Sequence, residues 1–319
     1  MKYLMKKIIT LIITLLLISF LSFAAFSVIP GDAALTKLGK DATEEQLMMM
    51  REEMGLDKPL PVRYVNWLLG ALHGDFGESY QYDDTQVSDL LKIRLPVTLL
   101  LAVMAFVIIL ILSVPLGILC ARFAGGWLDM LINQICQIVM AVPAFFLGIL
   151  ITYLFGLILR FFQPGNFVSP SENLWGSIQY LFYPALAVAL PKIAMVVKFL
   201  RNSILGELHK DYVRTARSKG NTEHGLLYGH VLKNAMIPVI TFMAMVIAEI
   251  LAGSIVVEQV FSVPGVGRLL ITAISGRDYP VVQAVVLYVT AVVVILNFLV
   301  DVLYQVLDPR VKESVEGRR

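Results

Sequence analysis

Residues 211–238 read DYVRTARSKGNTEHGLLYGHVLKNAMIP and form a basic segment of mixed polarity between two long apolar runs. Tyr212, Ala216 and the aliphatic stem of Lys219 recur at three-to-four spacing, which places them on one face of a helix. The first part of the segment is therefore predicted to form a short helix. Because the segment separates two apolar runs, we expect this helix to lie at a membrane surface.

Gly220 is the predicted end of that helix, because glycine readily adopts the left-handed conformation that commonly follows a last helical residue. Asn221 or Thr222 can then cap a second helix. We thus expect two short helices joined by a tight glycine turn. A simpler interpretation is an ordinary basic loop, held in the cytoplasm by its lysines and arginines, and it suits most basic loops of membrane proteins.

The composition indicates a membrane protein. Apolar residues make up 58% of the 319-residue chain, charged residues make up 16%, and the mean hydropathy is +0.77. A net charge of +2 is too small to indicate nucleic-acid binding. The only cysteines, Cys120 and Cys136, lie in apolar surroundings, imply no disulfide framework and are expected to be small buried thiols.

The N-terminal apolar run, residues 8–29, follows Lys2, Lys6 and Lys7. The small residues of Ser22-Phe23-Ala24, at positions 22 and 24, are compatible with a secretory signal peptide and its cleavage site. The length of the run instead matches the roughly 20 residues that span a bilayer, which favours an uncleaved first span. In either case the segment that follows lies outside.

Five further apolar runs are long enough to span a membrane, and proline within such helices is tolerated. These runs are residues 97–121, 131–159, 181–200, 237–257 and 281–307. Six spans place both termini on one side of the membrane. The chain is therefore predicted to be all-α and polytopic, a single membrane domain over residues 1–319.

The distribution of bases gives the orientation. The side that includes the termini carries 15 Lys and Arg in 65 residues, and the other side carries 10 in 110 residues. This excess assigns the termini and residues 201–235 to the cytoplasm. We accordingly expect a cysteine placed at Ser79 to react with reagents from outside, and one placed at Ser218 to be protected.

The extracytoplasmic insertion, residues 30–95, holds twelve acidic residues against seven basic ones. Thr43 and Gln46 have the spacing of a capping box, which predicts a helix that runs through Met54. Residues 60–72 predict a second short helix whose tyrosine and tryptophan suit a membrane interface.

Charges inside the predicted spans are rare, and they are Lys192, Glu249 and Asp301. Such charges are costly in a bilayer, so an ion or proton pathway is one interpretation. The alternative is that Lys192 reaches the interface, Asp301 packs near a helix end, and Glu249 faces a wet cavity or another subunit. Polar residues near the start of the third span are expected to pair with other helices; they are Asn133, Gln134 and Gln137.

The order Arg214-Thr215-Ala216, then Gly220, Asn234-Ala235 and Pro238, resembles the coupling loop of binding-protein-dependent ABC importer permeases. In that family a Glu-Ala-Ala triplet before a glycine forms a helix that docks into the ATPase subunit. The Arg-Thr-Ala form seen here is typical of the peptide/nickel branch. The resemblance assigns ATPase coupling to Asp211, Tyr212, Arg214, Thr215, Ala216, Arg217, Lys219, Gly220, Asn234 and Pro238.

A second resemblance to this branch lies in residues 257–270, VEQVFSVPGVGRLL, where Phe-x-x-Pro-Gly-x-Gly precedes a short helix. Pro264, Gly265 and Gly267 are expected to shape an extracytoplasmic, re-entrant turn. Further similar segments are residues 30–32, 55–60, 74–77, 277–279 and 301–310, so the resemblance covers most of the chain.

The resemblance implies the first-permease (B-type) subunit of an importer for di- or oligopeptides in the cell (inner) membrane. Its partners would be a second homologous permease, two ATPase subunits and an extracytoplasmic binding protein, and Glu249 is the best candidate for lining the translocation path. The chain has no Walker motif, so it is expected to have no ATPase activity of its own and no cofactor. Its four histidines form no metal-binding arrangement.

Three other functions stay open at this point. The same architecture can import nickel or another chelated metal, since selectivity lies mostly in the binding protein. An intramembrane enzyme would need a polar catalytic pair on facing spans. A non-transporting membrane anchor or sensor would leave the coupling-loop sequence unexplained.

Overall fold

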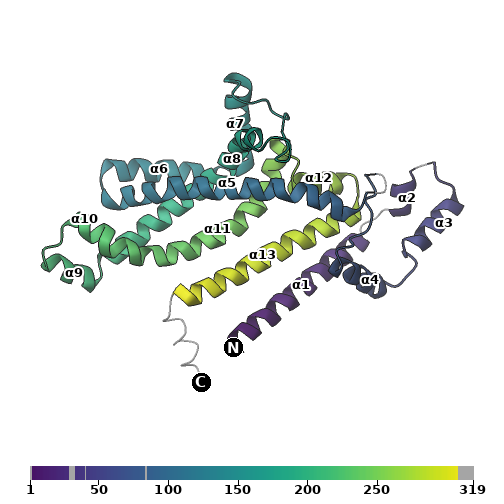
Figure 1. Ribbon diagram of the computed structural model, residues 1–319, viewed down its shortest axis with the longest axis horizontal. Helices are drawn as coiled ribbons and strands as arrows, with labels where there is room; N and C mark the ends of the chain where they lie inside the picture. Colours follow the sequence, from purple (N-terminus) through teal and green to yellow (C-terminus); the bar gives the residue numbers. More distant parts are fainter. Residues whose placement is uncertain (1, 29–32, 40, 83–84, 308–319) are drawn as a thin grey trace. The chain divides into compact units, whose positions relative to one another are not determined.

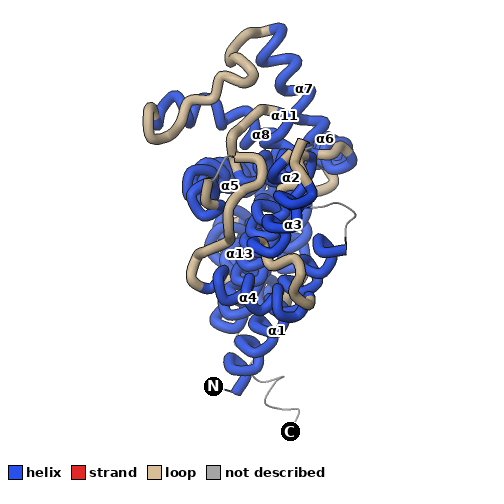
Figure 2. The backbone as a smooth tube through the Cα atoms, turned by 90° about the vertical axis from the view of Figure 1, so that its right-hand side faces the viewer, coloured by secondary structure: helices blue, strands red, loops and turns tan. Residues whose placement is uncertain are grey.

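The computed structural model describes residues 2–28, 33–39, 41–82 and 85–307 (Figure 1). Apart from one isolated bridge between Glu78 and Gln86, the regular structure of these residues is helical, which confirms the all-α prediction (Figure 2). The chain forms two compact units. The first comprises Met1–Leu99 and Ser262–Ile295, and the second comprises Leu100–Phe261 and Leu296–Arg319.

The first unit contains the N-terminal helix, the insertion that was predicted to be extracytoplasmic, and the segment around the last loop. Its helices are α1 (Lys2–Val28), α2 (Ala33–Leu38), α3 (Glu44–Glu53), α4 (Leu60–Leu72), the start of α5 (Val87–Arg122), α12 (Val266–Ser275) and most of α13 (Tyr279–Leu307). The capping box at Thr43 and Gln46 is present, with Met54 as the C-cap of α3. The α4 helix has the predicted bounds.

A buried apolar cluster joins α5, α12 and α13 within the first unit. It contains Val87, Leu90, Leu91, Val266, Leu269, Ala273, Val281, Val282, Ala284 and Val285. These side chains recur at helical spacing on each of the three helices, so each helix turns one apolar face to the cluster.

Ser79 lies beside this core and is only 1% exposed. Its hydroxyl donates a hydrogen bond of 2.5 Å to Oδ2 of Asp278, which is itself fully buried. The expectation that Ser79 is an accessible labelling position is therefore wrong. Its buried partner lies 199 residues away, and no local pattern indicates that contact.

The second unit is organised around α8 (Leu174–Leu208), which packs against α6 (Trp127–Ala141), α7 (Ala144–Ile151) and α11 (Leu232–Val260). A π-helical turn, η1 (Thr152–Ile158), continues α7. The segment between α8 and α11 contains α9 (Asp211–Ser218), α10 (Glu223–Leu226) and a second π-helical turn, η2 (Leu227–Val231).

The third predicted span, residues 131–159, is not one continuous helix. α6 ends at Ala141, α7 starts at Ala144, and the two directions differ by 100°. Pro143 causes the break: it has no N–H to donate, and it favours the extended conformation that Val142 adopts, with φ −96° and ψ 126°. Proline is thus a helix breaker here, although the sequence interpretation treated it as tolerated.

In the described part of the chain, five helices are long and apolar enough to cross a membrane, or six if the bent pair counts as one span. This agrees with a polytopic fold of six spans. The assignment of the loops to either side of the membrane stays a prediction.

Candidate functional site

The segment after α8 has the predicted helix–glycine–helix arrangement. α9 is followed by Gly220, whose φ of +85° is the left-handed conformation that glycine adopts without strain. The Asn221 side chain donates to the carbonyl of Ala216 at 3.0 Å, which closes the end of α9. Thr222 caps α10 by accepting from the N–H of Gly225 at 3.2 Å.

One side of α9 is anchored in the second unit. Val213 is fully buried, and the Tyr212 hydroxyl donates to Glu207 on α8 at 2.9 Å. Burial raises the pKa of the Tyr212 phenol, which Asn234 also contacts, so the phenol stays neutral at physiological pH. Lys219, predicted to share a helix face with Tyr212 and Ala216, is the exposed C-cap of α9. The periodicity therefore identified the helix but not its anchor, which is Val213.

The opposite side of α9 is exposed and basic. The exposed residues of the segment are Asp211, Arg214, Thr215, Arg217, Ser218, Lys219 and Gly220, and Ala216 is half-buried. Such a face is available for a partner. Farther along, Asn234 and Pro238 are exposed near the start of α11, in which Pro238 is an internal residue.

The two arginines of α9 differ in their surroundings. Arg217 makes two contacts with the Glu223 carboxylate, at 2.9 and 3.1 Å, across the glycine turn. Arg214 lies 3.9 Å from Asp211, and both side chains are largely exposed. Arg217 therefore holds α9 and α10 together, whereas Arg214 is the arginine better able to reach another protein. Sequence reasoning missed Glu223, because the turn alone brings it to Arg217.

Two of the intramembrane charges form an ion pair. Lys192 on α8 pairs with Glu249 on α11, and their side chains are 20% and 46% exposed. The interpretation that Lys192 reaches the interface is wrong, because its position on α8 turns it toward α11. The Asp301 side chain lies outside the described residues.

Glu249 belongs to an exposed stripe on α11. The stripe consists of Met245, Glu249, Ala252, Val256 and Gln259, which follow one another at intervals of four and three residues. This spacing places them on one side of the helix. The stripe thus presents one charge and one amide on an otherwise apolar surface.

A second charged cluster links α6 to α8, and sequence analysis did not find it. Asp129 accepts from Nε and Nη2 of Arg201, each at 2.6 Å. It also accepts from the Asn133 amide at 2.6 Å and the Gly125 N–H at 2.9 Å. Its side chain is only 4% exposed. A signal existed in the four-residue spacing of 129, 133 and 137, which places three polar residues on one face of α6.

Of the polar residues of α6, Gln137 pairs with another helix as expected, whereas Asn133 does not. Asn133 bonds to Asp129 of its own helix and helps to orient that carboxylate. Gln137 is reached by Lys198 of α8 at 3.5 Å, a long contact. The polar contact between α6 and α8 therefore runs mainly through Asp129 and Arg201.

The Pro264–Gly267 turn lies at the start of α12 in the first unit. The N–H of Val266 donates to Thr98 Oγ1 of α5 at 2.8 Å, and Arg94 donates to the Pro264 carbonyl at 3.4 Å. Gly265 is the extended N-cap of α12, and Gly267 is buried in its first turn. The turn is thus held against α5, and its functional role stays a prediction.

Cys120 and Cys136 are buried free thiols, as expected. The described part of the chain contains no group of three His, Cys, Asp or Glu side chains that could hold a metal ion. Among the loop histidines, His224 stacks near Tyr228 with ring centres 4.5 Å apart, and His209 bonds to the carbonyl of Leu205.

Comparison with known proteins gives matches along nearly the whole chain. Residues 113–313 match the family described as "Binding-protein-dependent transport system inner membrane component", and residues 1–102 match the corresponding N-terminal family. The chain is 33% identical over 310 residues to a probable peptide ABC transporter permease protein of Sinorhizobium fredii, covering 97% of this chain and 99% of the relative.

Two further relatives have similar coverage. A putative peptide transport system permease protein of Brucella suis is 36% identical over 307 residues, which cover 96% of this chain and 98% of the relative. The oligopeptide transport system permease protein AppB of Bacillus subtilis is 34% identical over 312 residues, which cover 97% of this chain and 99% of the relative.

Proposed function

This chain belongs to the family of inner membrane components of binding-protein-dependent transport systems, and we propose that it forms the translocation path for di- or oligopeptides in an ATP-driven importer. It is a multi-pass protein of the cell membrane and a transporter subunit. The peptide substrate is supported by the names of three relatives that match over nearly their full lengths.

The α9–Gly220–α10 arrangement is the observation that carries the coupling role. A helix with one anchored side and one exposed basic side can transmit force, because a push on the exposed side moves the anchor as well. Its anchor at Tyr212 and Val213 connects it to the end of α8. We assign this exposed side to an ATPase subunit, with half-buried Ala216 at the closest contact.

The complete importer would contain a second homologous permease, two ATPase subunits and an extracytoplasmic binding protein. Closure of the ATPases would act on α9 and α10, and loaded binding protein would act from the opposite side. Transport is then a change between two states, each favoured by one of these ligands.

The Lys192–Glu249 pair is assigned to the translocation path. A charge facing lipid costs roughly 2.5–3.5 kcal/mol even on insertion scales, which disfavours a lipid-facing position for exposed Glu249. A peptide carries a free ammonium and a free carboxylate. Its ammonium can pair with Glu249 and its carboxylate with Lys192, so that neither side chain is left with an unpaired charge.

Two substitutions test the coupling role. Gly220→Val places a β-branched residue at φ +85°, which costs on the order of 1–2 kcal/mol. Ala216→Trp overpacks the proposed contact, which costs roughly 1–3 kcal/mol. Both variants should insert normally, yet lose copurification with the ATPase or lose peptide uptake.

The matched controls are Gly206→Val and Ala216→Ser. Gly206 lies within α8, has open space where a Cβ would stand and has no left-handed backbone, so the same valine causes no comparable strain there. Both controls should retain the ATPase and uptake. Normal ATPase binding and normal uptake in Gly220→Val and Ala216→Trp would refute the coupling role.

A further inference from the structure

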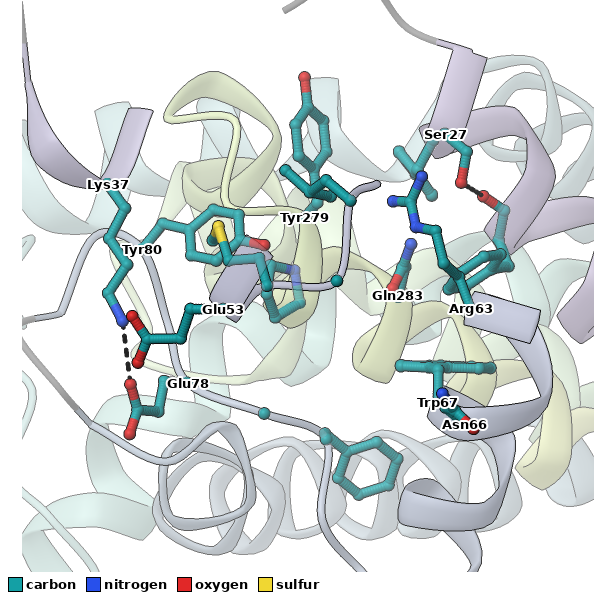
Figure 3. Close-up of a pocket in the computed structure, with 18 of the residues that line it drawn as sticks. Ser27, Lys37, Glu53, Arg63, Asn66, Trp67, Glu78, Tyr80, Tyr279 and Gln283 are labelled. Carbon is teal, nitrogen blue, oxygen red and sulfur yellow. Dashed lines mark hydrogen bonds and ion pairs between the residues drawn. The ribbon is translucent and has the colours of Figure 1, made fainter. Parts of the chain in front are cut away.

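A cavity of about 630 Å³ lies within the first unit, between α1, α3, α4, the segment around Tyr80 and the start of α13 (Figure 3). This volume falls within the roughly 300–1,000 Å³ typical of sites for small molecules. Neither Lys192 nor Glu249, which belong to the second unit, is among its lining residues. Nothing in the coupling or translocation roles proposed above uses it.

The charged side chains of the cavity fall into two groups. Figure 3 shows Arg63 near Gln283 and Trp67 on one side, and Lys37, Glu53 and Glu78 on the other. Lys37 Nζ contacts the Glu78 carboxylate at 3.0 Å, so that pair is satisfied internally. The lining as a whole has three acids and three bases and no net charge; they are Glu53, Asp75, Glu78, Lys37, Lys58 and Arg63.

The side with Arg63 has donors that lack acceptors. The buried Trp67 Nε1 has no hydrogen-bond partner in the described structure. In the described part of the chain no carboxylate lies within ion-pair distance of Arg63. Its guanidinium carbon is 5.9 Å from the centre of the Phe23 ring. Buried donors are nearly always satisfied, by protein, water or a ligand. A ligand group with negative charge could accept from the Trp67 N–H and pair with the guanidinium of Arg63, which is half-buried.

Part of the lining is apolar. This part includes Phe26, Met50, Met54 and Phe76, together with the ring of Tyr80. Burial raises the pKa of Tyr80 to about 12, and the positive charge of Arg63 acts in the opposite direction. Tyr80 is thus in poorly solvated surroundings that Arg63 can influence, and in such surroundings charge interactions are stronger than in water.

We propose that this cavity binds a short zwitterionic peptide, with its terminal carboxylate at Arg63 and Trp67 and its terminal ammonium at Glu53. A neutral lining with a cationic and an acidic group fits a ligand with one charge of each sign. The apolar part of the lining suits its side chains. An extended peptide spans roughly 3.3–3.6 Å per residue, so a few residues suffice.

This inference rests on the proposed function, because it takes peptides as the substrate. It adds a recognition site on the permease itself, in the segment predicted to be extracytoplasmic and apart from the translocation path. Its test therefore measures binding directly, without nucleotide or binding protein.

The experiment is titration calorimetry on the intact permease–ATPase complex in lipid nanodiscs. The probes are the tripeptide Ala-Phe-Ala, its N-acetyl form and its C-terminal amide. The native complex should bind the free tripeptide about tenfold or more tightly than either blocked form, since each block removes one charge-assisted contact. Equal affinities for the three probes, or no binding of the free tripeptide, would overturn the proposal.

Variants locate the two ends of the ligand. Arg63→Met should bind the free tripeptide and its C-terminal amide equally well, but should still prefer the free tripeptide to the N-acetyl form. Glu53→Gln should bind the free tripeptide and the N-acetyl form equally well, but should still prefer the free tripeptide to the amide. Arg63→Lys retains the charge and should keep both preferences. Lys92→Met is the matched control, because Lys92 is an exposed lysine of α5 outside the cavity. Discrimination that is unchanged in Arg63→Met and Glu53→Gln would also overturn the proposal.

Uptake by the complete importer separates this result from the proposed function. Peptide uptake without peptide binding in the cavity would refute only the inference. Failure of the native importer to take up any peptide would refute the proposed substrate instead.

Discussion

Removing Arg201 should strongly destabilise the second unit. The Asp129 side chain is 4% exposed in the native protein, and Arg201→Met leaves Asn133 and the Gly125 N–H as its remaining donors. Breaking a buried pair from one side costs roughly 3–5 kcal/mol, because it leaves a buried charge uncompensated. Two of the four contacts to Asp129 survive, so we expect the lower end of that range, about 3 kcal/mol.

The double variant tests the reasoning behind that magnitude. Asp129→Asn in the Arg201→Met background removes the uncompensated charge and keeps an amide oxygen for the Gly125 N–H. Part of the lost stability should therefore return, with a coupling energy of about 2 kcal/mol, within the range for residues in contact. Asp129→Asn alone should cost less than Arg201→Met, because Arg201 is more exposed and also reaches Asn202 at 3.2 Å.

The assay is reversible unfolding of the purified permease in mixed detergent micelles, for the native protein and the three variants. Lys198→Met is the control, because Lys198 makes only a 3.5 Å contact with Gln137. It should change the free energy of unfolding by about 0.5 kcal/mol or less. A loss below about 1 kcal/mol in Arg201→Met, or strictly additive effects in the double variant, would refute the reasoning.

Three further predictions concern transport, topology and ionisation. Lys192→Met should lower the amount of assembled permease available for transport more than the double variant with Glu249→Gln does, because the single variant leaves one unpaired charge; equal amounts in both would contradict this pairing. In a cysteine-free background, Glu45→Cys on the exposed side of α3 should react with an impermeant maleimide from outside, and Ser218→Cys should not; the reverse pattern would overturn the orientation. The Tyr80 phenolate should appear near pH 12 in a spectrum compared with Tyr80→Phe, and not near 10. Because the unfolded phenol ionises near 10, the contribution of this tyrosine to stability is complete below pH 10 and is lost as the pH rises toward 12.

Much of the fold is determined by the sequence itself, because its signals lie in residues close together in the chain. Hydropathy located the long helices, the Thr43–Gln46 spacing located the start of α3, and Gly220 located the turn after α9. A cap bonds to an N–H within three residues, and a left-handed turn depends on one φ angle. Such features require no knowledge of the tertiary structure. Pro143 is also evident in the sequence, but whether it breaks the helix depends on whether neighbouring groups replace the lost hydrogen bond.

Only the tertiary structure decided which charges meet. Glu249 is 57 residues from Lys192, and Asp129 is 72 residues from Arg201. Both pairings depend on how each helix is rotated about its axis. The cavity in the first unit likewise gathers side chains from α1, α3, α4 and α13. Helical periodicity states which residues share a face, but not which neighbour that face meets. Packing of the whole apolar core sets that rotation, and with it the partners of every buried charge.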